Sequence, residues 1–356
     1  MGKHFDGLDV IRSILALLVA SGHFFLWNGI STVVPASFFL SVDFFFVLSG
    51  FVLTQSVVYD RECNPKWFMA KFALRRLFRL YPLYLTVLLL TLCAVFLKFG
   101  ASAVTPRQIL TSVALLQGVI PDNSGVPIYA DTPVGIGWSV SVELWVSLSF
   151  FGMIFLLRRR TRLLALFSAA TVACSLLLMI SFSPNIMNVN MQGLLSVLSF
   201  GAIRGFLGLA AGALTFLLFE KLKEVSLASY QYTLLECGFI ILIPLIYLKF
   251  CEYERKGEYI FPVIAMACIL LVTIQRGFIS NSMYTARLSW FREISYSIYL
   301  VHPIGIFFFR QMHWSFTMVS AAFYLFLVVI MAVIAHRLIE KPGIALGKRL
   351  LSIYFN

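Results

Sequence analysis

The chain consists mainly of long apolar runs separated by short polar segments. Ten runs are about 18 residues or longer, the length that a helix needs to cross the hydrocarbon core of a bilayer. They lie near residues 8–27, 36–58, 78–97, 138–157, 162–181, 194–219, 226–248, 259–275, 289–309 and 317–336. Because a lipid-embedded backbone must satisfy its hydrogen bonds internally, such runs form helices. The pattern therefore predicts an all-α fold, a polytopic membrane helix bundle of about ten transmembrane helices.

The polar segments are too short to form a second, soluble domain, so residues 1–356 are predicted to be a single integral membrane domain. The longest segment runs from Phe99 to Gly137 and contains four prolines, with a short amphipathic or re-entrant piece expected at 107–119. A long ordered loop is often functional. We expect this one to help select a substrate.

Composition supports a membrane protein and explains the charge. The chain is 60% hydrophobic and 12% charged, about half the charged fraction of a soluble domain. With the N-terminus inside, 20 of the 28 Lys and Arg residues fall in inner segments and 6 in outer ones. This asymmetry predicts cytoplasmic termini in a cell (inner) membrane, and it accounts for the net charge of +12 without a nucleic-acid partner. The six cysteines form no CxxC pair, so neither a disulfide framework nor a metal site is expected.

The first run carries two ionisable residues, Arg12 and His23. Ionisable groups in spans are costly and are usually functional or paired. Eleven residues of helix return His23 to within ~20° of the face of Arg12, ~16 Å further along the axis. Arg12 would then lie near the cytoplasmic side and His23 near the outer side. The alternative is that Arg12 snorkels to lipid headgroups and His23 is a hydrogen-bonded core imidazole.

Two carboxylates are candidate partners of His23. Asp43 lies in the second run before three phenylalanines, and a buried carboxylate there needs His23 or an arginine as its partner. Glu143 lies near the start of the fourth run, at the expected depth of His23, where a carboxylate would hold the imidazole tautomer. A structural glutamate bonded within the bundle is the alternative. Gly50 is small enough to serve close helix packing.

A basic cluster precedes and begins the third run. Arg76 and Arg79 are three residues apart, so they are neighbours on a helix, and two guanidiniums together suit a phosphate. Arg75 is equally well explained as a topology signal. Among the other polar groups, Arg204 is expected to pair or line a cavity, and His302 with Pro303 to form a kink with a hydrogen-bonded imidazole.

Six stretches in order resemble membrane-bound acyltransferase family 3, of the polysaccharide or sugar O-acyltransferase type. They cover nearly the whole chain, and each alone is a weak signal. One departure is Val10-Ile11, where the family usually has Gly-Leu. The stretches are residues 8–12 (LDVIR) with His23, 42–51 (VDFFFVLSGF), 76–82 (RLFRLYP), 138–143 (WSVSVE), 294–303 (ISYSIYLVHP) and 339–342 (IEKP).

The resemblance implies an O-acyltransferase that moves an acyl group, often acetyl, from cytoplasmic acyl-CoA to a hydroxyl of an extracytoplasmic sugar, polysaccharide or glycolipid. Acyl-CoA would be a donor substrate, with no permanently bound cofactor or metal. On this hypothesis Arg12, Arg76 and Arg79 hold the CoA phosphates. His23 acts as general base, with Asp43 or Glu143 orienting its ring; in a variant of the mechanism, His23 itself takes the acyl group.

Two other classes of function fit parts of the pattern. A transporter or exporter could bind an anionic ligand through Arg12, Arg76 and Arg204 and carry a proton on His23, although the chain shows no internal repeat of the kind that many transporters have. A non-catalytic accessory subunit would leave the polar face of the first run unexplained. The acceptor, the acyl chain and the oligomeric state are not determined by the sequence.

Overall fold

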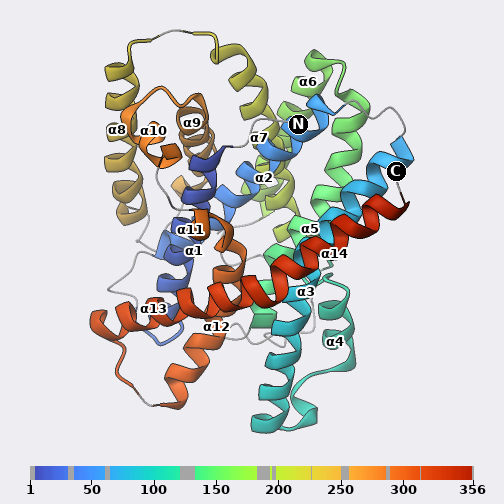
Figure 1. The fold of residues 1–356 in the computed structure, drawn as a ribbon, viewed down its shortest axis with the longest axis vertical. Coiled ribbons are helices and arrows are strands. Elements are labelled where there is room, and N and C mark those ends of the chain that lie inside the picture. Colours follow the sequence, from blue (N-terminus) through green and yellow to red (C-terminus); the bar gives the residue numbers. More distant parts are fainter. Residues whose placement is uncertain are drawn as a thin grey trace.

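The computed structural model describes an α-helical bundle that contains one two-residue pair of antiparallel strands (Figure 1). It describes residues 5–30, 36–60, 65–120, 133–182, 193–194, 198–225, 227–249, 256–285, 289–312 and 314–354. Residues 121–132 of the predicted substrate-selecting loop, His4, His313, Cys63 and Cys251 lie outside these ranges. The described part of that loop contains the helix α4 (Pro106–Val113), which confirms the short helical piece.

Every predicted run coincides with a described helix. Seven helical segments are long and apolar enough to cross a membrane, and α8 and α9 contain shorter apolar stretches. The ninth run corresponds to α12, with α11 before it. The all-α polytopic bundle is therefore confirmed. The helices are α1 (Asp6–Leu26), α2 (Leu40–Tyr59), α3 (Pro65–Phe99), α5 (Pro133–Leu157), α6 (Thr161–Phe182), α7 (Phe200–Leu222), α8 (Ser229–Lys249), α9 (Phe261–Ile274), α10 (Phe278–Thr285), α11 (Ser289–Glu293), α12 (Ser295–Gln311), α13 (Met318–Ala335) and α14 (Lys341–Tyr354).

The minor elements are the 3-10 turns η1 (Ala36–Phe39), η2 (Ala101–Ala103) and η3 (Lys256–Ile260), the π turn η4 (His336–Glu340), and the strands β1 (Gly193–Leu194) and β2 (Leu198–Ser199).

Two helices extend well beyond the predicted runs. α3 begins at Pro65, thirteen residues before the third run, because residues 65–77 continue the helix although they are basic. The tenth run does not stop at residue 336: the helical segment continues without a break to Tyr354 and crosses the bundle obliquely (Figure 1). A π turn lies just before Pro342, a residue that cannot donate a helical hydrogen bond.

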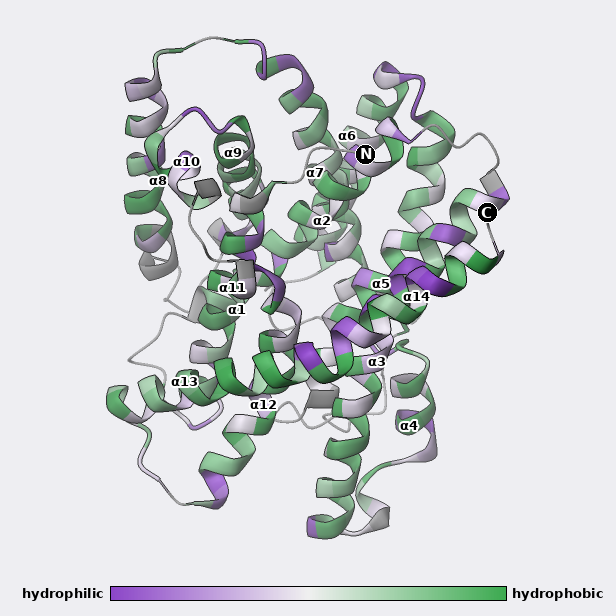
Figure 2. Ribbon diagram, in the orientation of Figure 1, coloured by the Kyte–Doolittle hydropathy of each residue, from purple (hydrophilic) through white to green (hydrophobic). Residues whose placement is uncertain are grey.

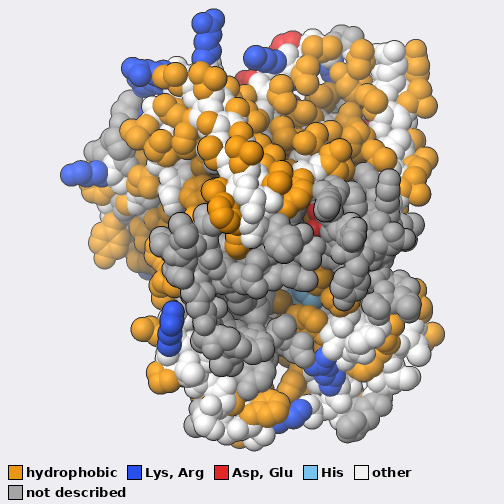
Figure 3. Space-filling model, turned by 180° about the vertical axis from the view of Figure 1, so that it is seen from behind, with side chains coloured by type: hydrophobic (Ala, Val, Ile, Leu, Met, Phe, Trp, Pro, Cys, Tyr) orange, Lys and Arg blue, Asp and Glu red, His pale blue; other side chains and the backbone are white. Residues whose placement is uncertain are grey.

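The surface of the bundle suits lipid over most of its area. Hydrophobic residues cover the helices, whereas hydrophilic residues gather at many helix ends and along α14 (Figure 2). Seen from behind, hydrophobic side chains fill the upper half of the face, and the Lys and Arg side chains lie mainly toward its margins (Figure 3). In a soluble protein such apolar surface would be a liability, whereas in a bilayer it is the contact surface.

The centre of the bundle is the pair of helices α2 and α7, which pack more extensively than any other pair among the described elements. Glycines make this approach possible. A Cβ on Gly50 would lie 2.2 Å from the Leu209 carbonyl oxygen, and one on Gly212 would lie 2.0 Å from that of Val47. Backbone therefore meets backbone across this interface, as small residues allow in membrane helices. The expected packing role of Gly50 is confirmed.

We predict opposite effects for the same substitution at two helical glycines. Gly212→Ala should lower the free energy of unfolding by about 1–3 kcal/mol, because the new methyl group forces α2 and α7 apart. Gly238→Ala in α8 meets nothing within 4 Å, so it should be neutral or raise stability by up to about 1 kcal/mol through helix propensity. Unfolding in mixed detergent micelles measures both. Equal losses in the two variants would contradict the close α2–α7 contact.

Candidate functional site

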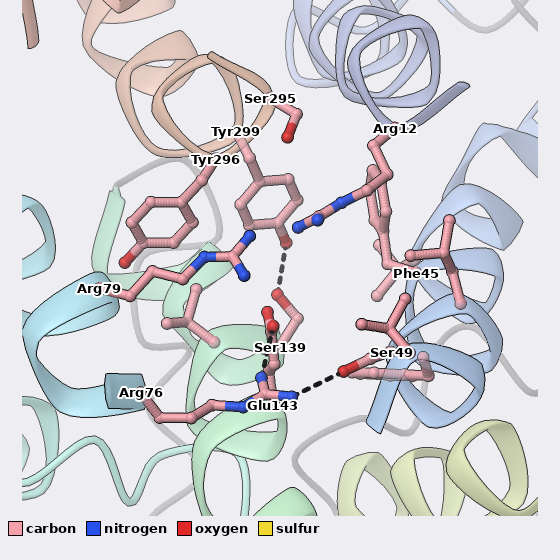
Figure 4. A pocket seen from close by; sticks show the side chains of 15 residues that line it. Arg12, Phe45, Ser49, Arg76, Arg79, Ser139, Glu143, Ser295, Tyr296 and Tyr299 are labelled. Atoms are coloured by element: carbon pink, nitrogen blue, oxygen red, sulfur yellow. Dashed lines mark hydrogen bonds and ion pairs between the residues drawn. The ribbon is translucent and has the colours of Figure 1, made fainter. Parts of the chain in front are cut away.

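A cavity of about 90 Å³ opens between helices α1, α2, α3, α5 and α12 (Figure 4). It draws residues from five separate segments of the chain, and two of these, α1 and α3, carry the three arginines that the sequence singled out. The lining residues are Arg12, Val42, Phe45, Phe46, Leu48, Ser49, Val52, Arg76, Arg79, Ser139, Val140, Glu143, Ser295, Tyr296 and Tyr299.

One of the three arginines is held by protein groups. The two terminal nitrogens of Arg76 donate to Glu143 Oε1 at 2.7 Å and to Ser49 Oγ at 3.0 Å. The Phe72 ring lies 5.3 Å from the guanidinium carbon. Because these contacts join α2, α3 and α5, Arg76 fixes the wall of the cavity. A guanidinium has five N–H donors, so Arg76 keeps donors beyond these two bonds.

The guanidiniums of Arg12 and Arg79 both point into the cavity (Figure 4). The nearest carboxylate oxygen recorded for Arg12 belongs to Asp9, at 3.5 Å. Within the described part of the chain, Arg79 has no ion pair or hydrogen bond. The lining thus contains three arginines and one glutamate, which leaves two positive charges uncompensated by the lining itself. Such a cavity suits an anionic group with several acceptor oxygens.

The position of the arginines follows from the early start of α3. Arg76 was expected just before the third span and Arg79 at its start, but α3 begins at Pro65. Arg76 is therefore eleven residues into the helix, about 16 Å from its first residue. The basic pair thus lies well inside a 35-residue helix and is partly buried, not displayed at a helix end.

His23 lies further along α1, enclosed by aromatic rings. Its side chain is buried, and the ring stacks on Trp27 at 4.3 Å between centroids. Phe38 and Phe39 lie at 5.2 and 5.5 Å. Its hydrogen bond goes to His302 on α12, with 2.9 Å between His23 Nδ1 and His302 Nε2. His302 is itself bonded through Nδ1 to the Tyr299 carbonyl oxygen at 2.7 Å.

Asp43 does not bond to His23, which corrects one of the two proposed orienting contacts. Its carboxylate takes two bonds from Arg204, at 3.1 Å from Nε and 2.7 Å from the second terminal nitrogen. The Trp138 ring lies 5.1 Å from the same guanidinium. Of the two partners considered for Asp43, an arginine is the correct one, and Arg204 is paired as expected. The pair joins α2 to α7 beside the glycine contacts.

Glu143 does not bond to His23 either, since its partner is Arg76. The expectation rested on a fourth span that begins at residue 138, which would place Glu143 at the outer end. α5 instead begins at Pro133, so Glu143 is ten residues into the helix, about 15 Å from its start. That depth puts it beside the arginines rather than the histidine.

His302 is a hydrogen-bonded imidazole, as expected, but its contact with His23 was not predicted. A signal for the contact was present. His23 lies fifteen residues into the first run and His302 thirteen into the ninth, and odd-numbered spans run in the same direction. The two residues were therefore at nearly equal depth, about 3 Å apart along the membrane normal.

Tyr299 connects the cavity to the histidine pair. Its hydroxyl shares a 2.7 Å hydrogen bond with Ser139, and its carbonyl receives the bond from His302. Its ring meets that of Phe45 edge-on at 6.4 Å between centroids. Neither histidine is among the lining residues. The arginines and the histidines thus form two adjacent parts of one site, separated by Tyr299 and Phe45.

Comparison with known proteins gives one family match that covers most of the chain. Residues 5–337 match the acyltransferase 3 family, described as an acyltransferase domain. A protein of Rhizobium radiobacter named "Protein 2 in picA locus" is 42% identical over 92 residues, which is 25% of this chain and 44% of that protein. A Bacillus subtilis protein named "Putative peptidoglycan O-acetyltransferase YrhL" is 26% identical over 328 residues, which is 84% of this chain and 48% of that protein. The chain thus spans less than half the length of each of these relatives. No solved structure matches it significantly.

We predict that Asp43 and Arg204 act as a unit in stability. Asp43→Leu or Arg204→Met alone should each cost about 3–5 kcal/mol in the free energy of unfolding, because each leaves a buried charge without its partner. The double variant Asp43→Leu/Arg204→Met should recover most of that loss. A double-mutant cycle of unfolding in detergent measures the coupling. Purely additive losses would show that the two residues do not depend on each other.

Proposed function

Because this chain belongs to the acyltransferase 3 family, we propose that it is a membrane O-acyltransferase. It moves an acyl group, with acetyl as the first candidate, from cytoplasmic acyl-CoA to a hydroxyl of an extracytoplasmic sugar, polysaccharide or glycolipid. The observation that carries the proposal is that α1 presents Arg12 to a cationic cavity and His23 to an aromatic enclosure. The two residues are about 16 Å apart on one continuous helix.

The cavity is the donor-binding end in this proposal. Acyl-CoA carries phosphate groups at one end of a long, narrow pantetheine arm and the reactive thioester at the other. Arg12 and Arg79 supply guanidiniums for the phosphates, and Arg76 holds the wall and contributes its remaining donors. The arm then reaches past Tyr299 and Phe45, which brings the thioester to His23.

At His23 the chemical step is a direct transfer. The acceptor hydroxyl oxygen attacks the thioester carbonyl carbon while His23 takes the hydroxyl proton. The carbon–sulfur bond breaks, and the thiolate of CoA leaves and receives the proton that His23 holds. The products are the acyl ester and CoA thiol, with His23 returned to its starting form. An acyl-histidine intermediate is the alternative course.

The proposed sidedness rests on the distribution of basic residues. The inner segments, which carry 20 of the 28 Lys and Arg, are assigned to the cytoplasm, where acyl-CoA is made. The acceptor approaches from the opposite side, at the end of α1. There Arg310 donates to Asn28 Oδ1 at 2.7 Å and to the Trp27 carbonyl, which fixes polar groups and an aromatic ring beside His23. The relative named as a peptidoglycan O-acetyltransferase supports a glycan hydroxyl as the acceptor.

The direct test is acceptor-dependent release of CoA thiol by the purified protein in lipid. We predict that His23→Ala lowers turnover on the order of 10²–10⁴-fold, the range for losing a general base. Ser21→Ala is the matched control on the same helix, because the Ser21 hydroxyl donates to the Leu18 carbonyl within α1. It should retain normal turnover. A protein that releases no thiol with any glycan acceptor but moves an anion across vesicles would be an exporter, and the proposal would fail.

The phosphate assignment is tested with two donors that share the thioester and the pantetheine arm, of which only one carries the phosphorylated nucleotide. Arg79→Gln should raise KM for acetyl-CoA about 10- to 100-fold, because charge-assisted hydrogen bonds contribute about 1.5–3 kcal/mol. KM for acetyl-pantetheine, which has no phosphates, should not change. Arg75→Gln removes the same charge from an exposed position on α3 outside the cavity, and it should affect neither donor. A similar rise for both donors would overturn the assignment.

A further inference from the structure

We propose that His302 is a positioning residue that selects the reactive tautomer of His23, with the proton on Nδ1 and a bare Nε2 facing the substrates. This inference deepens the proposed function and rests on it where it speaks of catalysis. The tautomer itself is a property of the resting protein and is measurable without any substrate.

The two rings are arranged end to end. Their planes differ by 3° and their centroids are 5.1 Å apart, while Nδ1 of His23 and Nε2 of His302 are 2.9 Å apart. The centroid separation of 5.1 Å exceeds the nitrogen–nitrogen distance of 2.9 Å by about 2.2 Å, which is close to the sum of the two distances from an imidazole centroid to its ring nitrogen. The nitrogen–nitrogen line therefore lies nearly along the line of centres, and the rings are coplanar neighbours rather than face-to-face partners. This is the geometry of a well-aligned hydrogen bond between two ring nitrogens.

The direction of that bond follows from the backbone. His302 Nδ1 lies 2.7 Å from the Tyr299 carbonyl oxygen, which can only accept. Nδ1 of His302 must therefore carry a proton, and a neutral His302 then has a bare Nε2. The bare nitrogen can only accept from His23, so the proton of His23 lies on Nδ1. The lone pair of His23 is left on Nε2, where a base needs it.

Pro303 explains why the Tyr299 carbonyl is available. In an α-helix the N–H of residue 303 would donate to the carbonyl of residue 299, but a proline has no N–H. The His302 side chain takes the acceptor that the next residue leaves open. His302 and Pro303 thus act together. The proline leaves the Tyr299 carbonyl without a backbone donor, and that carbonyl holds the proton on Nδ1 of His302.

A charged His302 would reverse the arrangement, because both of its nitrogens would donate and His23 would have to accept through Nδ1. The surroundings oppose this form. His302 is fully buried, and its ring neighbours include Tyr299 at 5.8 Å and Trp27 at 6.3 Å. Among the described residues, neither histidine forms an ion pair with a carboxylate. Burying a charge without a partner is costly, so the neutral pair is favoured.

The same geometry serves the transfer step. When Nε2 of His23 accepts a proton, Nδ1 continues to donate to His302, so neither ring has to rotate. This differs from a site in which a carboxylate orients the histidine ring, because His302 adds no negative charge beside His23. The imidazolium is then a short-lived species that returns its proton to the leaving thiolate.

The tautomer can be measured by ¹⁵N NMR on histidine-labelled protein in lipid. The protein contains five histidines. Comparison with His23→Gln assigns the His23 signals. We expect Nδ1 of His23 to be protonated and Nε2 to be bare. In His302→Leu, His23 should shift toward the Nε2-protonated form or a mixture. A wild-type His23 protonated on Nε2 would overturn the inference, whatever the enzyme's activity.

Kinetics test the catalytic consequence. His302→Leu should lower kcat by about 10-fold or more, because part of His23 loses the reactive tautomer and Nδ1–H loses its acceptor, with KM for acyl-CoA unchanged. His302→Gln keeps an acceptor for His23 Nδ1–H and should rescue most of the turnover. Tyr324→Phe is the control for disturbance of α12, because the Tyr324 hydroxyl donates to the His302 carbonyl at 3.0 Å without touching the ring. It should retain kcat.

Failure of this inference differs from failure of the proposed function. If His302→Gln and His302→Leu are equally inactive, or if Tyr324→Phe loses as much turnover, His302 acts through packing and the tautomer role is wrong. A wild-type protein without transferase activity but with Nδ1-protonated His23 would refute the proposed function while the pairing stands.

Discussion

The low dielectric of the bundle interior decides which charges the structure can hold, and the Asp43–Arg204 pair shows how this constraint is met. Arg204 is almost completely buried between α2 and α7, where an isolated guanidinium would be costly. Its two bonds to Asp43 compensate that cost and fix the rotation of both helices. The glycines beside the pair then bring the two backbones together. Every element of the site is attached, directly or through α5, to this central pair of helices.

Against that background, the charges that are not fully paired stand out. Arg76 shares Glu143 and Ser49, but Arg12 and Arg79 direct positive charge into a space that the protein leaves open. The histidine pair follows the opposite pattern, since its rings are buried among aromatic groups without an ion pair to a carboxylate in the described structure. In the proposed function, the cationic end of the site attracts the anionic donor and the aromatic end keeps the histidine base neutral. Separating these two environments by about three turns of α1 allows both to exist in one small bundle.

The sequence was sufficient to predict where the helices lie, but not which polar side chains bond to one another between helices. Apolar runs locate a helix for each predicted span, because lipid leaves the backbone few alternatives. The candidate residues were found because ionisable groups inside such runs are conspicuous. Their partners depend on where helices begin and how they rotate. Glu143 was assigned to the wrong depth because α5 starts at Pro133, and Asp43 to the wrong orienting role because Arg204 is on the adjoining face of α7. His302 was expected to be hydrogen-bonded, and its depth matched that of His23, but the packing of α12 against α1 is what brings the two rings together.

The oblique C-terminal helix bears on how this protein can be engineered. Gly343 and Gly347 of α14 lie directly against α3, where a Cβ would be 2.6 Å from Pro82 and 2.5 Å from Phe78. These contacts flank Arg79 in the sequence of α3. A version shortened at the end of the tenth apolar run, near residue 336, would look complete by hydropathy and would still insert in a membrane. It would nevertheless lose the packing behind an arginine that lines the cavity, so purification tags and fusion partners belong after this helix and not in place of it.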